Sequence, residues 1–163
     1  MRRSGGFSLI ELLVVVAVLT ILALLAFGFE REALARLQVE AAARRVLLGL
    51  ERGRAAAERE GRACALSLDQ RGWRAPTAGG LPGCGGAPLE LGEGVATLGE
   101  LTVQHNLPSA VRFSSNGLVL DGGTVLVGHP ATALIRCVVV SLPLGVTRVG
   151  LQGEAGCRPD PSL

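Results

Sequence analysis

An apolar run near the start of the chain limits what this sequence can fold into. Over residues 12–29 only Thr20 and Gly28 interrupt the apolar character. A helix over residues 7–29 would be about 34 Å long at roughly 1.5 Å per residue, enough to cross a hydrocarbon core of about 30 Å. The 163 residues leave room for one further domain with a modest core. The run therefore predicts a membrane helix over residues 7–29.

The charges around this run predict its orientation. Arg2 and Arg3 precede it without a compensating acid, and an excess of positive charge keeps a short flank in the cytoplasm. A secretory signal would have a shorter apolar region that ends at a small-residue cleavage site. Here charged, helix-compatible residues follow Phe29 directly. We therefore expect a retained, single-pass membrane anchor, with the C-terminal part exported.

Glu11 does not fit an ordinary membrane anchor. A carboxylate at the bilayer centre costs about 2.5–3.5 kcal/mol on insertion scales, and less toward the interface. Two interpretations follow from the residues alone: Glu11 tolerates an interfacial position, or it awaits a positive partner within an assembly.

The sequence around Glu11 resembles a known processing signal. GFSLIE at residues 6–11, with basic residues before it and the apolar run after it, closely resembles the class III signal of type IV prepilins and pseudopilins. The resemblance implies that a prepilin peptidase removes residues 1–6 as a leader, cuts between Gly6 and Phe7, and methylates the new amine. It also implies that Glu11 pairs with the terminal amine of a neighbouring subunit, since a buried charge needs an opposite charge nearby.

A second, polar half is expected to continue the same helix. Residues 30–62 contain eight Arg and six Glu but no Pro. The apolar positions that recur on one helical face are Val39, Ala43, Val46, Leu47 and Leu50. No stop signal separates the two halves, so we predict one continuous helix that ends near Gly61. Gly49 and Gly53 should weaken it locally, each by roughly 1 kcal/mol relative to Ala.

Residues 63–163 are expected to form a β-rich domain. Short apolar runs split by Gly, Pro and Asp predict strands at 63–68, 73–75, 95–97, 101–105, 111–114, 118–120, 124–128, 133–142 and 147–151. The segment 76–94, with seven Gly and three Pro, predicts an irregular loop, and the most apolar run, 134–142, a central strand. The fold class is therefore α+β: a long N-terminal helix packed on an antiparallel sheet that covers its apolar face.

This domain resembles the GspH/FimT group of minor pseudopilins and minor pilins. The resemblance lies in the hairpin with Trp73, in VRFSSNG at 111–117, in VVVS at 138–141, and in GVTR at 145–148, where the group often has Gly-Arg-x-Arg. It implies a pilin-like fold and a structural subunit of either a type IV pilus or a type II secretion pseudopilus. The implied partners are a prepilin peptidase, other pilins or pseudopilins, and the inner-membrane assembly platform, with the C-terminal domain in the periplasm.

Four cysteines lie outside the apolar run: Cys64, Cys84, Cys137 and Cys157. An even number in an exported domain indicates disulfides, with three possible connectivities, while buried free thiols are the alternative. Their spacing is unlike that of a zinc site, and we expect neither metal nor cofactor. The pairings local in sequence, Cys64–Cys84 and Cys137–Cys157, are preferred. Each would close a loop of about 20 residues, worth roughly 3 kcal/mol in the chain-entropy model.

The sequence shows no catalytic constellation, so we do not expect an enzyme. His105 and His129 fit loop or strand-end positions, and no phosphate-binding loop is present. A formal net charge of +2 also excludes a strongly basic protein that coats nucleic acid.

DNA binding in natural transformation is the alternative function, and it rests on resemblance. Some FimT-like minor pilins bind DNA through Arg residues in the Gly-Arg-x-Arg turn and in the C-terminal tail. Here Arg148 matches the second Arg, Val146 replaces the first, and Arg158 is a possible further contact. From Ala63 onward six Arg face seven acids, so we expect any DNA binding to be weak.

Overall fold

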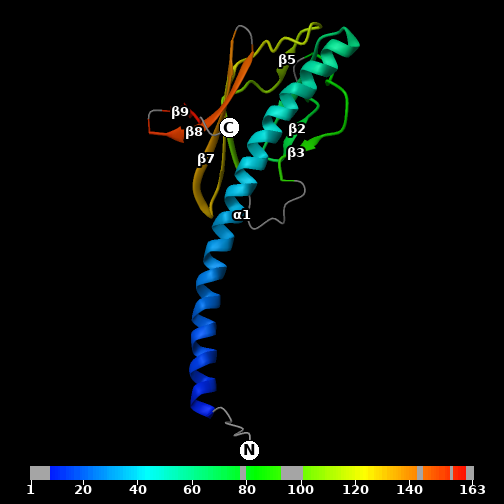
Figure 1. Cartoon of the computed structure of the whole chain (residues 1–163). Helices are drawn as coiled ribbons and strands as arrows, with labels where there is room; N and C mark the ends of the chain where they lie inside the picture. The colour runs from blue at the N-terminus through cyan, green and yellow to red at the C-terminus, as the bar shows by residue number, and fades with distance from the viewer. Residues whose placement is uncertain (1–7, 78–79, 93–100, 143–144, 155, 161–163) are drawn as a thin grey trace, which may run out of the picture.

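The fold consists of one long helix with the strands packed on its second half (Figure 1). The structure, a computed structural model, describes residues 8–77, 80–92, 101–142, 145–154 and 156–160, without the side chains of residues 25–30. Helix α1 runs unbroken over Leu9–Glu60. Its first half extends away from the rest of the molecule, and its second half packs against strands (Figure 1).

The helix ends where its sequence changes. Gly61 adopts a left-handed conformation with φ 60°, which a residue without a Cβ accepts at little cost. Its N–H donates to the Glu58 carbonyl and the Arg62 N–H donates to the Ala57 carbonyl, both at 3.2 Å. These bonds satisfy two carbonyl groups in the last turn of the helix, and α1 ends one residue before Gly61, close to the expected position.

The described residues after the helix form nine strands in two antiparallel sheets. The strands are β1 Cys64–Leu68, β2 Gly72–Arg74, β3 Leu89–Glu90, β4 Thr102–His105, β5 Val111–Phe113, β6 Gly123–His129, β7 Thr132–Ser141, β8 Val146–Gly153 and β9 Gly156–Pro159. The smaller sheet has the order β3-β2-β1-β5 and the larger one β4-β6-β7-β8-β9. The expected α+β class is therefore confirmed, and β7 is the central strand of its sheet.

The strand expectations differ from the structure in four places. Two sheets replace the one expected. Of residues 118–120 only Val119 pairs, in an isolated bridge with Phe113. Strands β3 and β9 were not expected, because neither short segment shows apolar alternation: pairing with β2 and with β8 makes them strands. The strand expected at 95–97 lies outside the described residues.

The core lies between the second half of α1 and both sheets. Helix residues Val39, Val46 and Leu50 are at most 1% exposed, and Trp73 and Phe113 are the largest fully buried side chains. The helix contacts β6 and β7 of the larger sheet and β1 of the smaller one. The predicted apolar stripe is thus the surface on which both sheets meet.

Gly49 and Gly53 let the two largest core side chains reach the helix backbone. A Cβ added to Gly49 would lie 2.0 Å from Trp73 Cδ1, and one added to Gly53 would lie 2.4 Å from Phe113 Cζ. The Trp73 indole N–H also donates to the Val46 carbonyl at 3.1 Å. The glycines that weaken the isolated helix therefore permit its closest packing.

Gly49→Ala should destabilise the domain although Ala is the better helix former. Overpacking against Trp73 costs about 1–3 kcal/mol, and helix propensity returns up to about 1 kcal/mol. We expect the free energy of unfolding to fall by about 1–2 kcal/mol in denaturant titrations of the full chain in detergent. Ala55→Gly on the exposed side is the control: it should lose only propensity and leave Trp73 fluorescence unchanged. A more stable Gly49→Ala variant would contradict this packing.

Candidate assembly and binding surfaces

The helix begins with a reciprocal cap made by Ser8 and Glu11. The Glu11 N–H donates to Ser8 Oγ at 3.3 Å, and the Ser8 N–H donates to Glu11 Oε2 at 2.9 Å. This capping box satisfies N–H groups that a helix start leaves unpaired. The Ser-x-x-Glu spacing signals it in the sequence, but the sequence analysis missed it. Gly6 and Phe7 lie outside the described residues.

The first half of α1 presents apolar side chains that pack on no other described part of the chain. The large side chains from Leu9 to Leu24 are between 50% and 77% exposed. Within the described residues, no helix has both the length and the apolar character that crossing a membrane requires. The expected span of 7–29 includes residue 7 and the side chains at 25–29, which lie outside this description.

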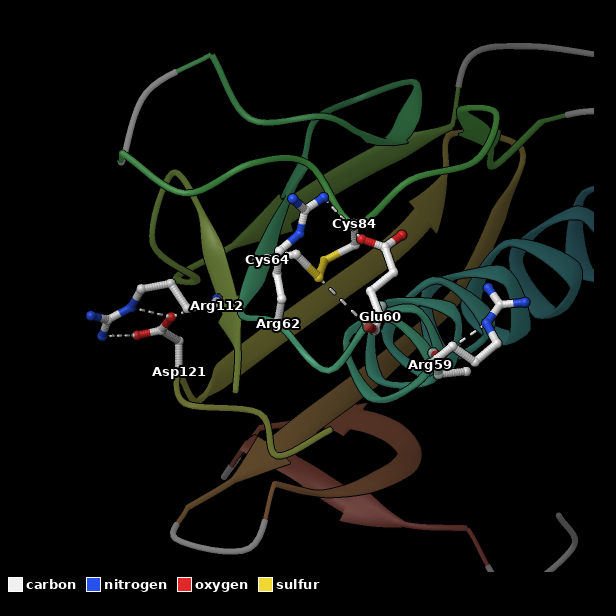
Figure 2. The surroundings of a disulfide bond; sticks show 9 residues. Arg59, Glu60, Arg62, Cys64, Cys84, Arg112 and Asp121 are labelled. Carbon is white, nitrogen blue, oxygen red and sulfur yellow. Dashed lines mark hydrogen bonds and ion pairs between the residues drawn. A yellow bond between two sulfur atoms is a disulfide. The ribbon is translucent and has the colours of Figure 1, made fainter. Parts of the chain in front are cut away.

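The disulfide Cys64–Cys84 fastens the Gly-rich loop beside the end of α1 (Figure 2). Cys64 opens β1, and Cys84 lies in the loop. Next to the bond, the Ala65 N–H donates to the Pro82 carbonyl at 2.9 Å and the Cys84 N–H donates to the Ala65 carbonyl at 3.2 Å. The loop is therefore held along β1 by covalent and backbone contacts together.

The disulfide Cys137–Cys157 joins β7 to β9 across the strand between them. Cys137 pairs with Gly150 of β8, while Cys157 pairs with Gln152 of β8. A Cβ added to Gly150 would lie 2.0 Å from the Arg158 carbonyl oxygen and 3.2 Å from Cys157 Sγ, so the glycine lets the β9 backbone and the disulfide lie close to β8. Both pairings preferred from sequence are present, and no cysteine is free.

Arg136 ties the tail to the helix through a buried ion-pair network. It lies on β7 with a 7% exposed side chain, and its Nη2 is 3.0 Å from Glu40 Oε1 of α1. Its Nη1 contacts Asp160 Oδ2, just after β9. Burial opposes the charge, but hydrogen bonds to Asp160 and Glu40 raise the pKa of Arg136 above its ordinary value. Sequence reasoning missed this network because its members are distant along the chain.

A second ion pair, between Arg112 and Asp121, lies at the surface beside β5. Arg112 Nε and Nη2 lie 3.0 and 2.8 Å from the two carboxylate oxygens of Asp121, as Figure 2 shows. Hydrogen bonds from Arg112 lower the pKa of Asp121 below its ordinary value. This pair is exposed on its arginine side, so it fixes geometry more than it adds stability.

The side chains of the two candidate DNA contacts, Arg148 and Arg158, project from opposite faces of the larger sheet. Arg148 pairs with Val139, and Arg158 pairs with Leu151. Directly paired residues share a face, and successive residues of a strand alternate. Arg148 and Leu151 are an odd number of positions apart on β8, so Arg158 projects from the face opposite to that of Arg148. The structure therefore does not bring these two side chains onto one surface.

The histidines occupy strand ends, as the sequence suggested. His105 ends β4 and is exposed. His129 ends β6, is 4% exposed, and accepts a hydrogen bond at Nδ1 from the Ala131 N–H at 3.1 Å. Within the described residues no three His, Cys, Asp or Glu side chains gather where they could share a metal ion.

Removing Arg136 should weaken both the attachment of the residues after β9 and the contact between α1 and β7. Arg136→Ala would leave Asp160 and Glu40 without their cation, and we expect a loss of about 2–3 kcal/mol in the free energy of unfolding. Asp160→Asn should cost more than Glu40→Gln, because Asp160 is 10% exposed and Glu40 34%. Arg112→Ala is the exposed control and should have little effect. Equal stability of Arg136→Ala and the parent would show that the network is dispensable.

Two sequence families match the chain. The prokaryotic N-terminal methylation motif matches residues 1–27, and type II transport protein GspH matches residues 42–144. No curated protein and no solved structure gives a significant match. The second match covers more than half of the chain, from the second half of α1 to the end of β7. The chain therefore belongs to the type II transport protein GspH family and is a GspH/FimT-like minor pilin with an N-terminal methylation motif.

Proposed function

We propose that this protein is a minor pseudopilin of a type II secretion system, anchored in the inner membrane before it joins a periplasmic filament. The observation that carries the proposal is the apolar first half of α1. Its large side chains from Leu9 to Leu24 are at least half exposed in the isolated chain. Such a surface needs lipid or other apolar helices around it. The family description favours secretion over a pilus, since it names type II transport.

Continuity of the helix supports a filament role. Because α1 is unbroken from Leu9 to Glu60, the apolar segment and the domain are one mechanical unit. Packing of the apolar segments against one another, first among lipids and then inside a filament, would place the domains around the outside. In this scheme residues 7–29 serve as the anchor and residues 63–163 as the periplasmic domain, with the inner-membrane assembly platform and other pseudopilins as partners.

Processing would place a charge beside Glu11. A prepilin peptidase that cuts between Gly6 and Phe7 leaves an amine on Phe7, one residue before the helix cap. The Glu11 carboxylate lies at this end of α1, where it already accepts the Ser8 N–H. We propose that it also accepts the terminal amine of a neighbouring subunit, which neutralises both charges in an apolar surrounding.

DNA uptake is the weaker alternative. Arg148 and Arg158 project from opposite faces of the sheet, and Val146 stands where an Arg was expected. From Ala63 onward the domain carries six Arg and seven acids. A continuous basic track, which DNA binding needs, is therefore not favoured.

Gly6→Leu should leave the precursor uncut but still inserted in the membrane. A peptidase must bring the backbone at the cleavage point close to its own catalytic groups, and a bulky side chain obstructs this approach. Gly6→Ala, which stays small, is the control and should still be cut. N-terminal sequencing and mass spectrometry of protein from the native host provide the measurement. An intact MRRSGG on the mature protein would contradict the proposal.

Two substitutions at Glu11 separate the role of its charge from its role in the cap. Gln can complete a capping box, but it cannot neutralise an amine. Glu11→Gln should therefore fold and insert normally yet enter filaments poorly, as Glu11→Ala should. The measurement is the amount of each variant in sheared filaments relative to the membrane fraction. Normal incorporation of Glu11→Gln, with failure of Glu11→Ala alone, would assign Glu11 to capping and reject the charge pair.

A further inference from the structure

A cavity of about 300 Å³ lies between α1 and the Gly-rich loop. Its floor is Trp73 and Leu66, its helix wall is Gly49, Arg52 and Gly53, and its outer wall is the loop segment 83–89. This volume is at the lower end of the range for ligand sites, about 300–1,000 Å³. It suits one large apolar side chain together with a small polar group.

Small residues make up much of the helix wall and the loop wall of the cavity. The loop side contains Gly83, Gly85, Gly86 and Ala87, which carry at most a methyl group. The helix side cannot be enlarged, because a Cβ on Gly49 would collide with the Trp73 ring. The larger side chains of these two walls are Arg52 on the helix side and Pro88 and Leu89 at the end of the loop segment.

The loop is held open from both ends. Cys84 is bonded to Cys64, and the Cys84 N–H donates to the Ala65 carbonyl at 3.2 Å. At the other end β3 pairs with β2, and Arg45 Nη1 of α1 donates to the Glu90 carbonyl at 2.8 Å. Residues 85–88 between these fastenings are exposed. A braced loop over a cavity is preorganised, which lowers the entropic cost of binding.

The charges around the cavity are positive. Arg52 and Arg74 line it, and no Asp or Glu does among the described residues. Arg74 Nε is 2.9 Å from Asp69 Oδ2 outside the cavity. Arg52 is exposed and forms no ion pair within the described part of the chain. A ligand that fits would therefore combine an apolar body with a carboxylate.

We propose that this cavity receives an acidic segment of another filament subunit, with a large apolar side chain over Trp73 and a neighbouring carboxylate on Arg52. This inference rests on the proposed function, because in a filament the domain is surrounded by other subunits. The exposed residues 85–88 form a rim that a polypeptide covers when one of its side chains inserts. Guanidinium–carboxylate hydrogen bonds then give the preference for an acidic partner.

The fluorescence of Trp73 tests the proposal directly, since the chain has one Trp and that residue lines the cavity. The full chain in detergent micelles is titrated with the peptide acetyl-Gly-Phe-Glu-Gly-amide. We expect a saturating change in Trp73 emission. The matched peptides with Gln in place of Glu, and with Ala in place of Phe, should bind about tenfold more weakly, because each lacks one of the two contacts.

Variants locate the response in the cavity. Arg52→Gln should weaken the Phe-Glu peptide about tenfold, and Ala87→Leu should abolish the response by filling the space. Arg44→Gln is the matched control: Arg44 is exposed on the same helix but lines a different cavity. No response to the Phe-Glu peptide, or an equal response to the Gln peptide, would overturn the proposal. The proposal would also be overturned if Arg44→Gln weakened peptide binding as much as Arg52→Gln does. The same holds if a DNA duplex bound more strongly than the peptide and its binding depended on Arg52.

Failure of this proposal and failure of the proposed function give different results. If the peptide does not bind but the protein is cut after Gly6 and enters filaments, the cavity proposal alone is wrong. If the precursor stays uncut in its host, the proposed function is wrong whatever the peptide does. If the Arg52→Gln variant binds the Phe-Glu peptide poorly and enters filaments less than the Arg44→Gln variant does, the cavity proposal and the proposed function are both supported.

Discussion

The contact of Trp73 and Phe113 with the glycines of α1 is the constraint on which the rest of the structure depends. Both sheets pack against one apolar stripe of α1 to form the core. The two aromatic rings reach the helix only because Gly49 and Gly53 lack a Cβ. A chain with so few aromatics places its largest buried side chains at this one seam. Both rings belong to the smaller sheet, so this contact sets the distance between that sheet and the helix, and with it the shape of the cavity beside Trp73.

Covalent and ionic links then hold the segments that the core does not reach. Cys64–Cys84 fastens a loop that is too rich in Gly to pack by itself, and Cys137–Cys157 fastens the last strand across β8. Arg136 adds a third link between the tail and α1. A small domain with a modest core depends on such links, because they restrict its unfolded state or pair its buried charges.

The same helix that organises the core also presents an unsatisfied surface. Its apolar first half packs on nothing else in the described chain, and a capping box completes its start at Ser8 and Glu11. Stability of the domain and association of the subunit are therefore located on different halves of one rigid element. Because α1 is unbroken from Leu9 to Glu60, a displacement of its N-terminal half is transmitted to the domain without a hinge.

The sequence by itself determined the membership, the long helix and its end near Gly61, the α+β class, the central position of β7 and the preference for the two local disulfides. Membership follows from the resemblance of short motifs, and the other features depend on composition, spacing and periodicity within short segments. Only the tertiary structure decided that Gly49 and Gly53 are packing sites, that Arg136 joins Glu40 to Asp160, and that Arg148 and Arg158 face apart. It also divided the strands between two sheets and hollowed the cavity under the Gly-rich loop. Such features arise between residues tens of positions apart, where strand register and the space left by neighbouring side chains set the geometry, and a linear pattern records neither.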